Sequence, residues 1–412
     1  MRKVRRSPRA LVAVTLAAAA IVAGPVPAPA AVPTATAPSA PHVATQAAMD
    51  WQRTALRTVY AERGTAVPVG PLYLAFTSLA VRDATLTSLH RPRSSETAAI
   101  AAAAHGVLTA YFPDSRSGLD ADLTTTLASV PDGQAERKGV RIGRRSASEI
   151  IEARDDDGRN DTTIVYRREA APGVWVAPPT GMAAAWLGFV DMVLLDQPVV
   201  VDGPDRLSSA AYAVDFDEVM RLGSDASDTE RTDEQTAIAQ FFTANSVLVY
   251  RLALLDHLQV APVSLRTTVD LFALADAATA DTLIQAWRLK FDVGFWRPFQ
   301  AIAGAETDRN PATALVPGWQ PLVPNPPYAD YTSGHAAATS SFAEAVRLVL
   351  GDDVSLKITG TGGAVRTYTS LSAVEDDALN ARIWSGLHFR DAMEDGYRLG
   401  HVTARRIENR MW

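Results

Sequence analysis

The sequence contains no cysteine. This absence excludes disulfide bonds, thiolate zinc sites, iron–sulfur clusters and cysteine nucleophiles. Aromatic residues make up only 7% of the 412 residues, while 47% are hydrophobic and 21% are charged. This composition is typical of an ordinary globular protein and not of a disordered chain. The length allows one large domain or two to three smaller ones, with a core of ample size.

Basic residues are outnumbered by acidic ones. The chain has 39 Lys and Arg against 46 Asp and Glu, which gives a formal net charge of −7 at pH 7. Five of the basic residues lie within residues 1–30, a stretch with no acidic residue, so the remainder is more acidic still. We therefore expect no nucleic-acid partner.

Residues 1–30 have the pattern of a signal peptide. The basic stretch Arg2–Arg9 precedes an apolar run of 15 residues, Ala10–Gly24, and Ala28–Ala30 then offers a small-residue cleavage site. An uncleaved membrane anchor is the alternative interpretation, although the run is short for a bilayer span. Residues 31–47, rich in Ala, Pro and Thr, are expected to form a flexible linker.

No later segment has 18 uninterrupted apolar residues. The sequence therefore predicts a protein that is secreted to the extracellular space after cleavage of its signal peptide, with no stable membrane insertion.

Residues 48–412 show mostly helical periodicity, which predicts an all-α fold in one large helical-bundle domain, with two packed bundles as the alternative. Helices are expected over Met49–Arg63, Pro71–Leu89, Ser95–Tyr111, Gln134–Arg154, Ala336–Leu350, Ala373–Leu387 and Ala392–Arg410, with two or three more within Glu234–Phe291. Short extended segments are expected at Thr162–Tyr166 and Val174–Ala177, where β-branched residues stand beside Pro and Gly. Residues Ile358–Tyr368 are expected to be irregular or briefly extended.

Two cations in the last third of the chain stand in apolar surroundings. Lys290 and Arg297 are seven residues apart, two helical turns, and are flanked by Phe291, Phe295 and Trp296. Two cations inside an apolar wall need an anion. The alternative is that the aliphatic stems pack against the wall while the charged heads reach water.

A second segment, Tyr331–His335, follows a proline-rich stretch and opens an alanine-rich helix. The free N–H groups and the positive end of the helix dipole at Ser333 and Gly334 would form a cradle for an oxyanion. His335 would lie on the first turn of that helix. An ordinary helix cap with an incidental histidine is the alternative.

A third segment places Arg382 and His388 among large apolar residues. Asp391 lies three residues after His388, close enough to accept its ring N–H and fix its tautomer. A hydrogen-bonded core histidine is the alternative. Nothing in the sequence assigns a role to Asp330, which lies beside the expected cradle. Taken together, three cations, a helix N-terminus and two histidines describe a site for a tetrahedral oxyanion such as phosphate or vanadate.

The order and spacing of these residues resemble the three-part signature of the vanadium-dependent haloperoxidases, which they share with the type 2 phosphatidic acid phosphatase (PAP2) superfamily. The three parts are Lys290-(six residues)-Arg297-Pro298, Thr332-Ser333-Gly334-His335 and Arg382-(five residues)-His388. Trp287, three residues before the lysine, also matches the haloperoxidase branch, and the motifs lie within residues 287–391.

Three positions depart from the family pattern. Thr332 stands where the family has Pro, and Ala381 where it usually has Ser. The Asp usually found four residues after the last histidine is displaced to Asp391, three residues after it.

The resemblance implies vanadate as the cofactor and a helical-bundle fold. It implies that five residues hold the vanadate oxygens: Lys290, Arg297, Ser333, Gly334 and Arg382. His388 would be the axial vanadium ligand and a catalytic residue, and His335 the acid–base group. Trp287 and Asp391 would contact these residues and hold them in position.

The reaction implied is that of a haloperoxidase, in which hydrogen peroxide oxidises a halide to hypohalous acid, and a small organic substrate accepts the halogen. One alternative is a secreted acid phosphatase, in which His388 attacks phosphorus and forms a phosphohistidine. The other is a non-catalytic, degenerate oxyanion-binding protein.

Overall fold

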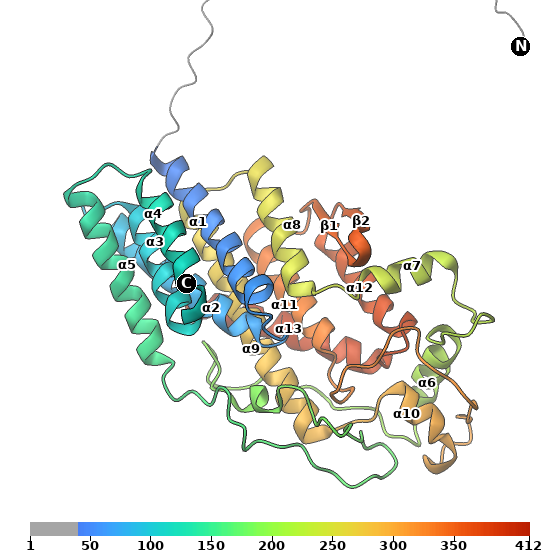
Figure 1. Ribbon diagram of the computed structural model, residues 1–412. Helices are drawn as coiled ribbons and strands as arrows, with labels where there is room; N and C mark the ends of the chain where they lie inside the picture. Colours follow the sequence, from blue (N-terminus) through green and yellow to red (C-terminus); the bar gives the residue numbers. More distant parts are fainter. Residues whose placement is uncertain (1–39) are drawn as a thin grey trace, which may run out of the picture. The chain divides into compact units, whose positions relative to one another are not determined.

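A computed structural model describes residues 40–412, which cluster into one unit (Figure 1). The predicted signal peptide (1–30) and residues 31–39 of the predicted linker lie outside the described residues. The described part contains thirteen α-helices and one two-stranded sheet. The predicted all-α class is confirmed.

Five helices build the N-terminal half: α1 (Ala40–Leu56), α2 (Gly70–Leu89), α3 (Glu96–Tyr111), α4 (Arg116–Leu127) and α5 (Gln134–Ala153). Figure 1 shows α3 and α5 side by side. The contact is close because small residues meet there: a Cβ on Gly143 of α5 would lie 2.2 Å from the carbonyl oxygen of Ala99 on α3.

The start of α1 corrects the sequence prediction. Residues 40–47 were expected to belong to a flexible linker, yet they form the first two turns of α1. Ala44 and Ala47 are buried in these turns. Alanine has the highest helix propensity, and burial of these methyl groups adds to it. After α1 the helix continues as a π-helical turn, η1 (Arg57–Glu62).

The long central helix α9 (Leu265–Val293) connects the two halves of this unit. It packs against α1 and α2 on one side and against α11 and α13 on the other. Because it is buried on nearly every face, its polar residues need partners inside the protein. The Asp281 carboxylate, for example, accepts the backbone N–H groups of Leu194 at 3.0 Å and Leu195 at 2.9 Å.

The C-terminal half packs α11 (Gly334–Leu350), α12 (Leu371–Trp384) and α13 (Arg390–Met411) together. Four further helices complete it: α6 (Ala210–Leu222), α7 (Asp233–Phe241), α8 (Ser246–Val260) and α10 (Pro298–Ala303). Strands β1 (Leu356–Thr359) and β2 (Val365–Tyr368) form an antiparallel hairpin within the segment expected to be briefly extended.

The two other extended segments are not strands. Residues 162–166 form turn and loop, and Val174 makes only an isolated bridge to Phe295. Neither segment has a neighbouring strand along which a ladder of hydrogen bonds could form, and an isolated pair is marginal at best. Within residues 40–412 no single helix is long and apolar enough to cross a membrane; α7 and α8 would pass that test only together, and they are bent by 89°.

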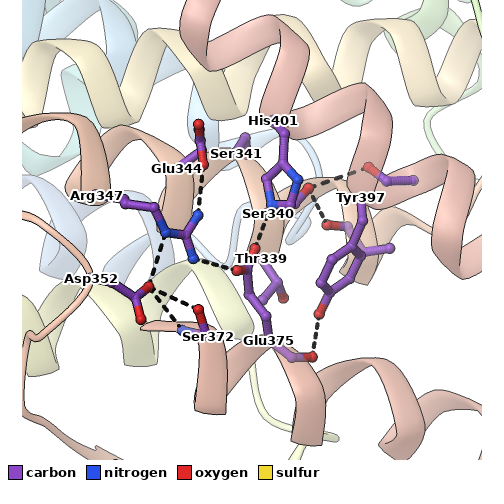
Figure 2. A network of polar contacts seen from close by, with 12 residues as sticks. Thr339, Ser340, Ser341, Glu344, Arg347, Asp352, Ser372, Glu375, Tyr397 and His401 are labelled. Atoms are coloured by element: carbon purple, nitrogen blue, oxygen red, sulfur yellow. Dashed lines mark hydrogen bonds and ion pairs between the residues drawn. The ribbon is translucent and has the colours of Figure 1, made fainter. Parts of the chain in front are cut away.

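A network of charged residues fixes α12 against α11 and α13 (Figure 2). Arg347 of α11 donates to Glu344, to Asp352 and, at 2.6 Å, to Glu375 of α12. The other carboxylate oxygen of Glu375 meets His401 of α13 at 2.6 Å. The three helices therefore have defined positions relative to one another.

The contact between α11 and α13 depends on Gly400. A Cβ at this position would lie 2.0 Å from the Ser340 hydroxyl oxygen and 2.6 Å from the Ser341 backbone nitrogen.

We predict that Gly400→Ala lowers the free energy of unfolding by about 3 kcal/mol, measured by chemical denaturation, because the backbone of α11 has to move. Gly118→Ala on α4 is the control, because a Cβ there meets nothing within 4 Å. It should leave the stability unchanged or raise it by up to about 1 kcal/mol. Equal effects of the two substitutions would contradict this account of the contact.

Candidate active site

The residues of the three motifs come from four helix ends and from the loop before α13. Lys290 lies in the last turn of α9, and Arg297 caps α10. Ser333 caps α11, Arg382 lies in the last turn of α12, and His388 lies in the turn before α13. Helix ends are where backbone groups are free to bind a ligand.

The segment 328–330 holds the first two cations. The Lys290 ammonium donates to the carbonyl oxygens of Ala329 at 2.7 Å and Asp330 at 2.9 Å. The Arg297 guanidinium donates to the carbonyl of Tyr328 at 2.7 Å, and both cations lie over the Tyr328 ring, 5.0 and 5.1 Å from its centroid. The guanidinium also donates to the carbonyl of Leu387 at 2.8 Å. Leu387 precedes His388, so this bond joins the first motif to the third.

The start of α11 was expected to form an oxyanion cradle, and Ser333 acts there as the cap of the helix. The Ser333 hydroxyl accepts the N–H of Ala336 at 3.3 Å, and the Ser333 N–H donates to the carbonyl of Ala392 at 2.9 Å. Gly334 packs against the Trp287 ring, where an added Cβ would lie 3.0 Å from the nearest ring carbon. The indole N–H of Trp287 donates to the carbonyl of Ala183 at 3.0 Å, so the ring is fixed on both edges.

His388 has a carboxylate partner, but not the expected one. Its Nδ1 lies 2.7 Å from a carboxylate oxygen of Asp330, and the two side chains are 1% and 0% exposed. We assign the proton to Nδ1, since a carboxylate beside two cations is an acceptor. The Nε2 atom of His388 is then left with a free lone pair.

Asp391 belongs to a different group of contacts, so its predicted role as partner of His388 is wrong. Its carboxylate accepts the N–H of Asp205 at 3.1 Å, and its own N–H donates to Asp215 at 2.8 Å. Asp391 lies in the first turn of α13, where the helix dipole and these backbone contacts hold it. The one sequence signal that could have found Asp330 is that it is a carboxyl residue directly beside the expected cradle.

The charges of the site do not balance without a ligand. Lys290, Arg297 and Arg382 are 0%, 0% and 4% exposed, and the only carboxylate described in contact with them is Asp330. Burial lowers the pKa of Arg382 to about 10 and of Lys290 well below its usual value, and it raises the pKa of Asp330 to about 7. With Asp330 ionised and all three basic side chains protonated, two positive charges would remain in excess, and a bound anion would neutralise them.

Both histidines are neutral near pH 7. Burial is the largest cause that lowers the pKa of His335 and of His388 well below 6.5, and the three cations lower both further. Each histidine is thus within the electrostatic reach of Lys290, Arg297 and Arg382. The predicted cofactor-binding residues and histidines therefore surround one place.

Several buried polar atoms at this place have no hydrogen-bond partner. They are Nε2 of His335, Nε of Arg382, Oδ2 of Asp330 and the hydroxyl of Thr332. Buried polar atoms are normally paired, so orphaned atoms in one place indicate a ligand. The cations, the helix N-terminus and the glycine cradle fit vanadate, an oxyanion that needs donors around its oxygens.

A cavity of about 130 Å³ lies beside His335. Trp287, Tyr328, Gly334 and Val67 also line it. Most of the lining is apolar.

Part of the chain matches a known family model, and its fold matches solved structures. Residues 270–411 match the family model of the VCPO second helical-bundle domain. A bacterial vanadium-dependent iodoperoxidase is 19% identical, with a TM-score of 0.71 over 90% of this chain and 96% of that one. The holo form of a bacterial vanadium-dependent chloroperoxidase is 17% identical, with a TM-score of 0.65 over 84% of this chain and 91% of that one. No curated protein matches the chain by sequence.

The family model covers the part of the chain that contains all three motifs, and the solved structures share the fold of most of the chain. The resemblance to the vanadium haloperoxidase and PAP2 superfamily is thereby confirmed for the part of the chain that contains the motifs.

The contacts of Asp391 give a prediction about stability. Burial, followed by neighbouring carboxylates, raises the pKa of Asp391 to about 7 and that of Asp215 to about 6. A carboxyl group whose pKa is higher in the folded state than in the unfolded chain, about 3.9, favours folding when protonated. Its cost to stability therefore grows as the pH rises from about 4 to 7, and it is complete above pH 7.

Asp391→Asn removes this cost. We expect the variant to be more stable than the wild type by about 1 kcal/mol at pH 8, after allowance for solvent screening of a half-buried group, and the difference should shrink at pH 5. Denaturation curves at the two pH values test this. A variant that is less stable than the wild type at pH 8 would contradict the conclusion that burial and neighbouring carboxylates destabilise ionised Asp391.

Proposed function

We propose that the protein is a vanadate-dependent haloperoxidase, which uses hydrogen peroxide to oxidise a halide to hypohalous acid. The observation that supports this most strongly is the burial of three basic side chains, Lys290, Arg297 and Arg382, near two histidines. In the overall reaction two electrons pass from the halide to peroxide, one peroxide oxygen joins the halogen, and the other leaves as water.

The roles of the residues follow from their contacts. Lys290, Arg297 and Arg382, with Ser333 and the N–H of Gly334, would hold the vanadate oxygens, and Nε2 of His388 would bind the vanadium. Bound vanadate would supply a Lewis acid that polarises hydrogen peroxide without a change in its own oxidation state.

His335 is the acid–base group in this proposal. Its Nε2 is buried without a partner, and the imidazole is neutral, so this nitrogen can take a proton from hydrogen peroxide and return it to the leaving oxygen. The three cations oppose a long-lived positive charge on the ring, so the proton is passed on quickly.

The phosphatase alternative uses the same groups, and the His388–Asp330 pair suits a histidine nucleophile. The size of the cavity favours the peroxidase. A space of about 130 Å³ accommodates peroxide and a halide easily, whereas a cavity of roughly 150 Å³ is filled by one benzene molecule. Most organic phosphate esters would leave their alcohol portion outside. A degenerate binding protein would hold the oxyanion but catalyse neither reaction.

We also propose that the protein is exported by its N-terminal segment, as its sequence predicts, and that the organic substrate is a small molecule halogenated by hypohalous acid. Iodide is the first halide to assay, because one structural relative is an iodoperoxidase.

The test is oxidation of iodide and bromide by hydrogen peroxide, followed with an indicator dye, with and without added vanadate. We expect activity that depends on vanadate and falls at least about 100-fold in His388→Ala, because this substitution would remove the side chain proposed to bind the vanadium. His257→Ala on α8, outside the site, should retain full activity. Rapid hydrolysis of a small phosphate ester without halide oxidation would favour the phosphatase. Retention of activity by His388→Ala would show that the site is assigned wrongly.

A further inference from the structure

Tyr60, far upstream of the three motifs, lies on the π-helical turn η1. π-Helical turns are rare and often occur at functional sites. The Tyr60 hydroxyl donates to the carbonyl of Val67 at 3.3 Å. Its ring lies directly against Gly70, where an added Cβ would come within 2.2 Å of the phenol oxygen. The phenol therefore has a fixed position, and residue 70 has to be glycine to allow it.

The phenol also contacts a second segment. The side chain of Asn245 forms a hydrogen bond with Tyr60. Because the Asn245 carbonyl oxygen already accepts the N–H of Leu248 at 3.2 Å as the cap of α8, its amide N–H is the group left to donate to the phenol oxygen. The single oxygen atom of Tyr60 thus connects the loop at Val67 to the turn before α8.

Both connected segments form the cavity in front of the candidate active site. Val67 and Pro68 come from the first segment, and residues 243–245 come from the second. The backbone of Ala244, next to Asn245, forms a hydrogen bond with His335. Nε2 of His335 is a buried ring nitrogen without a hydrogen-bond partner by distance and angle.

We propose that Tyr60 is a positioning residue for His335. Its hydroxyl holds the turn 243–245 in place, Ala244 of that turn sets the orientation of the imidazole, and Val67 sets the outer wall of the cavity. The proposal rests on the proposed acid–base role of His335. It gives the π-helical turn η1 a role in positioning the acid–base group, although this turn contains none of the motif residues.

Two variants remove the connection and leave the oxyanion-binding residues untouched. Tyr60→Phe loses both hydrogen bonds of the phenol. Asn245→Ser keeps an oxygen that can cap α8 but loses the amide donor. Tyr111→Phe is the matched control, because the Tyr111 hydroxyl is a buried group of the same half of the protein with no partner.

The first readout does not depend on activity. In protein labelled with ¹⁵N and ¹³C at histidine, with the His335 signals assigned from His335→Ala, we expect both variants to shift the His335 ring signals. Tyr111→Phe should leave them unchanged. Phosphate affinity, measured by calorimetry, should stay within about threefold of the wild type in all three, because no cation is altered.

The second readout is kinetic. For vanadate-loaded enzyme we expect a fall of about tenfold in kcat and a displaced pH profile in both Tyr60→Phe and Asn245→Ser, as expected when a general base is misplaced. A lowered melting temperature with unchanged His335 signals and an unchanged pH profile would show that Tyr60 only stabilises the fold and would overturn the proposal. If the wild type oxidises no halide, the proposed function fails, while the NMR comparison still decides whether Tyr60 orients His335.

Discussion

Three buried cations with one carboxylate between them are the constraint on which the rest of this structure depends. Lys290 and Arg297 are fully buried and Arg382 nearly so, while Asp330 offsets only one of their charges. Burial of unpaired charge is costly, so such a group is retained where a ligand of opposite charge binds. The neutral histidines, the glycine cradle and the orphaned polar atoms are explained by the same missing partner.

The fold keeps these cations together by fixing helix ends. Central helix α9 supplies Lys290, and the network around Glu375 holds α12, which supplies Arg382, against α11, which supplies the cradle (Figure 2). Backbone carbonyls of residues 328–330 and of Leu387 occupy donors of Lys290 and Arg297. These contacts fix the orientation of each cation before an anion arrives, which is the preorganisation that catalysis by charged groups requires.

The long helices and the three basic residues in apolar surroundings could be predicted from the sequence. The partner of His388 and the start of α1 could not, for physical reasons. α11 was expected to end at Leu350 because Gly351 stops it, and it does. The cations were recognisable because their apolar neighbours left them without a natural partner. The pairing of Asp330 with His388 joins segments 58 residues apart, which no local spacing reveals. Residues 40–47 were wrongly expected to be flexible, because composition alone did not show that Ala44 and Ala47 would be buried.

The most direct test of the central claim is calorimetric titration of the intact protein with orthovanadate at pH 8. The account predicts one saturable site per chain that phosphate displaces competitively and that persists at high ionic strength, because buried charges are weakly screened. Absence of binding, or only several weak sites abolished by salt, would contradict it, since the cations would then not form a common site for an oxyanion.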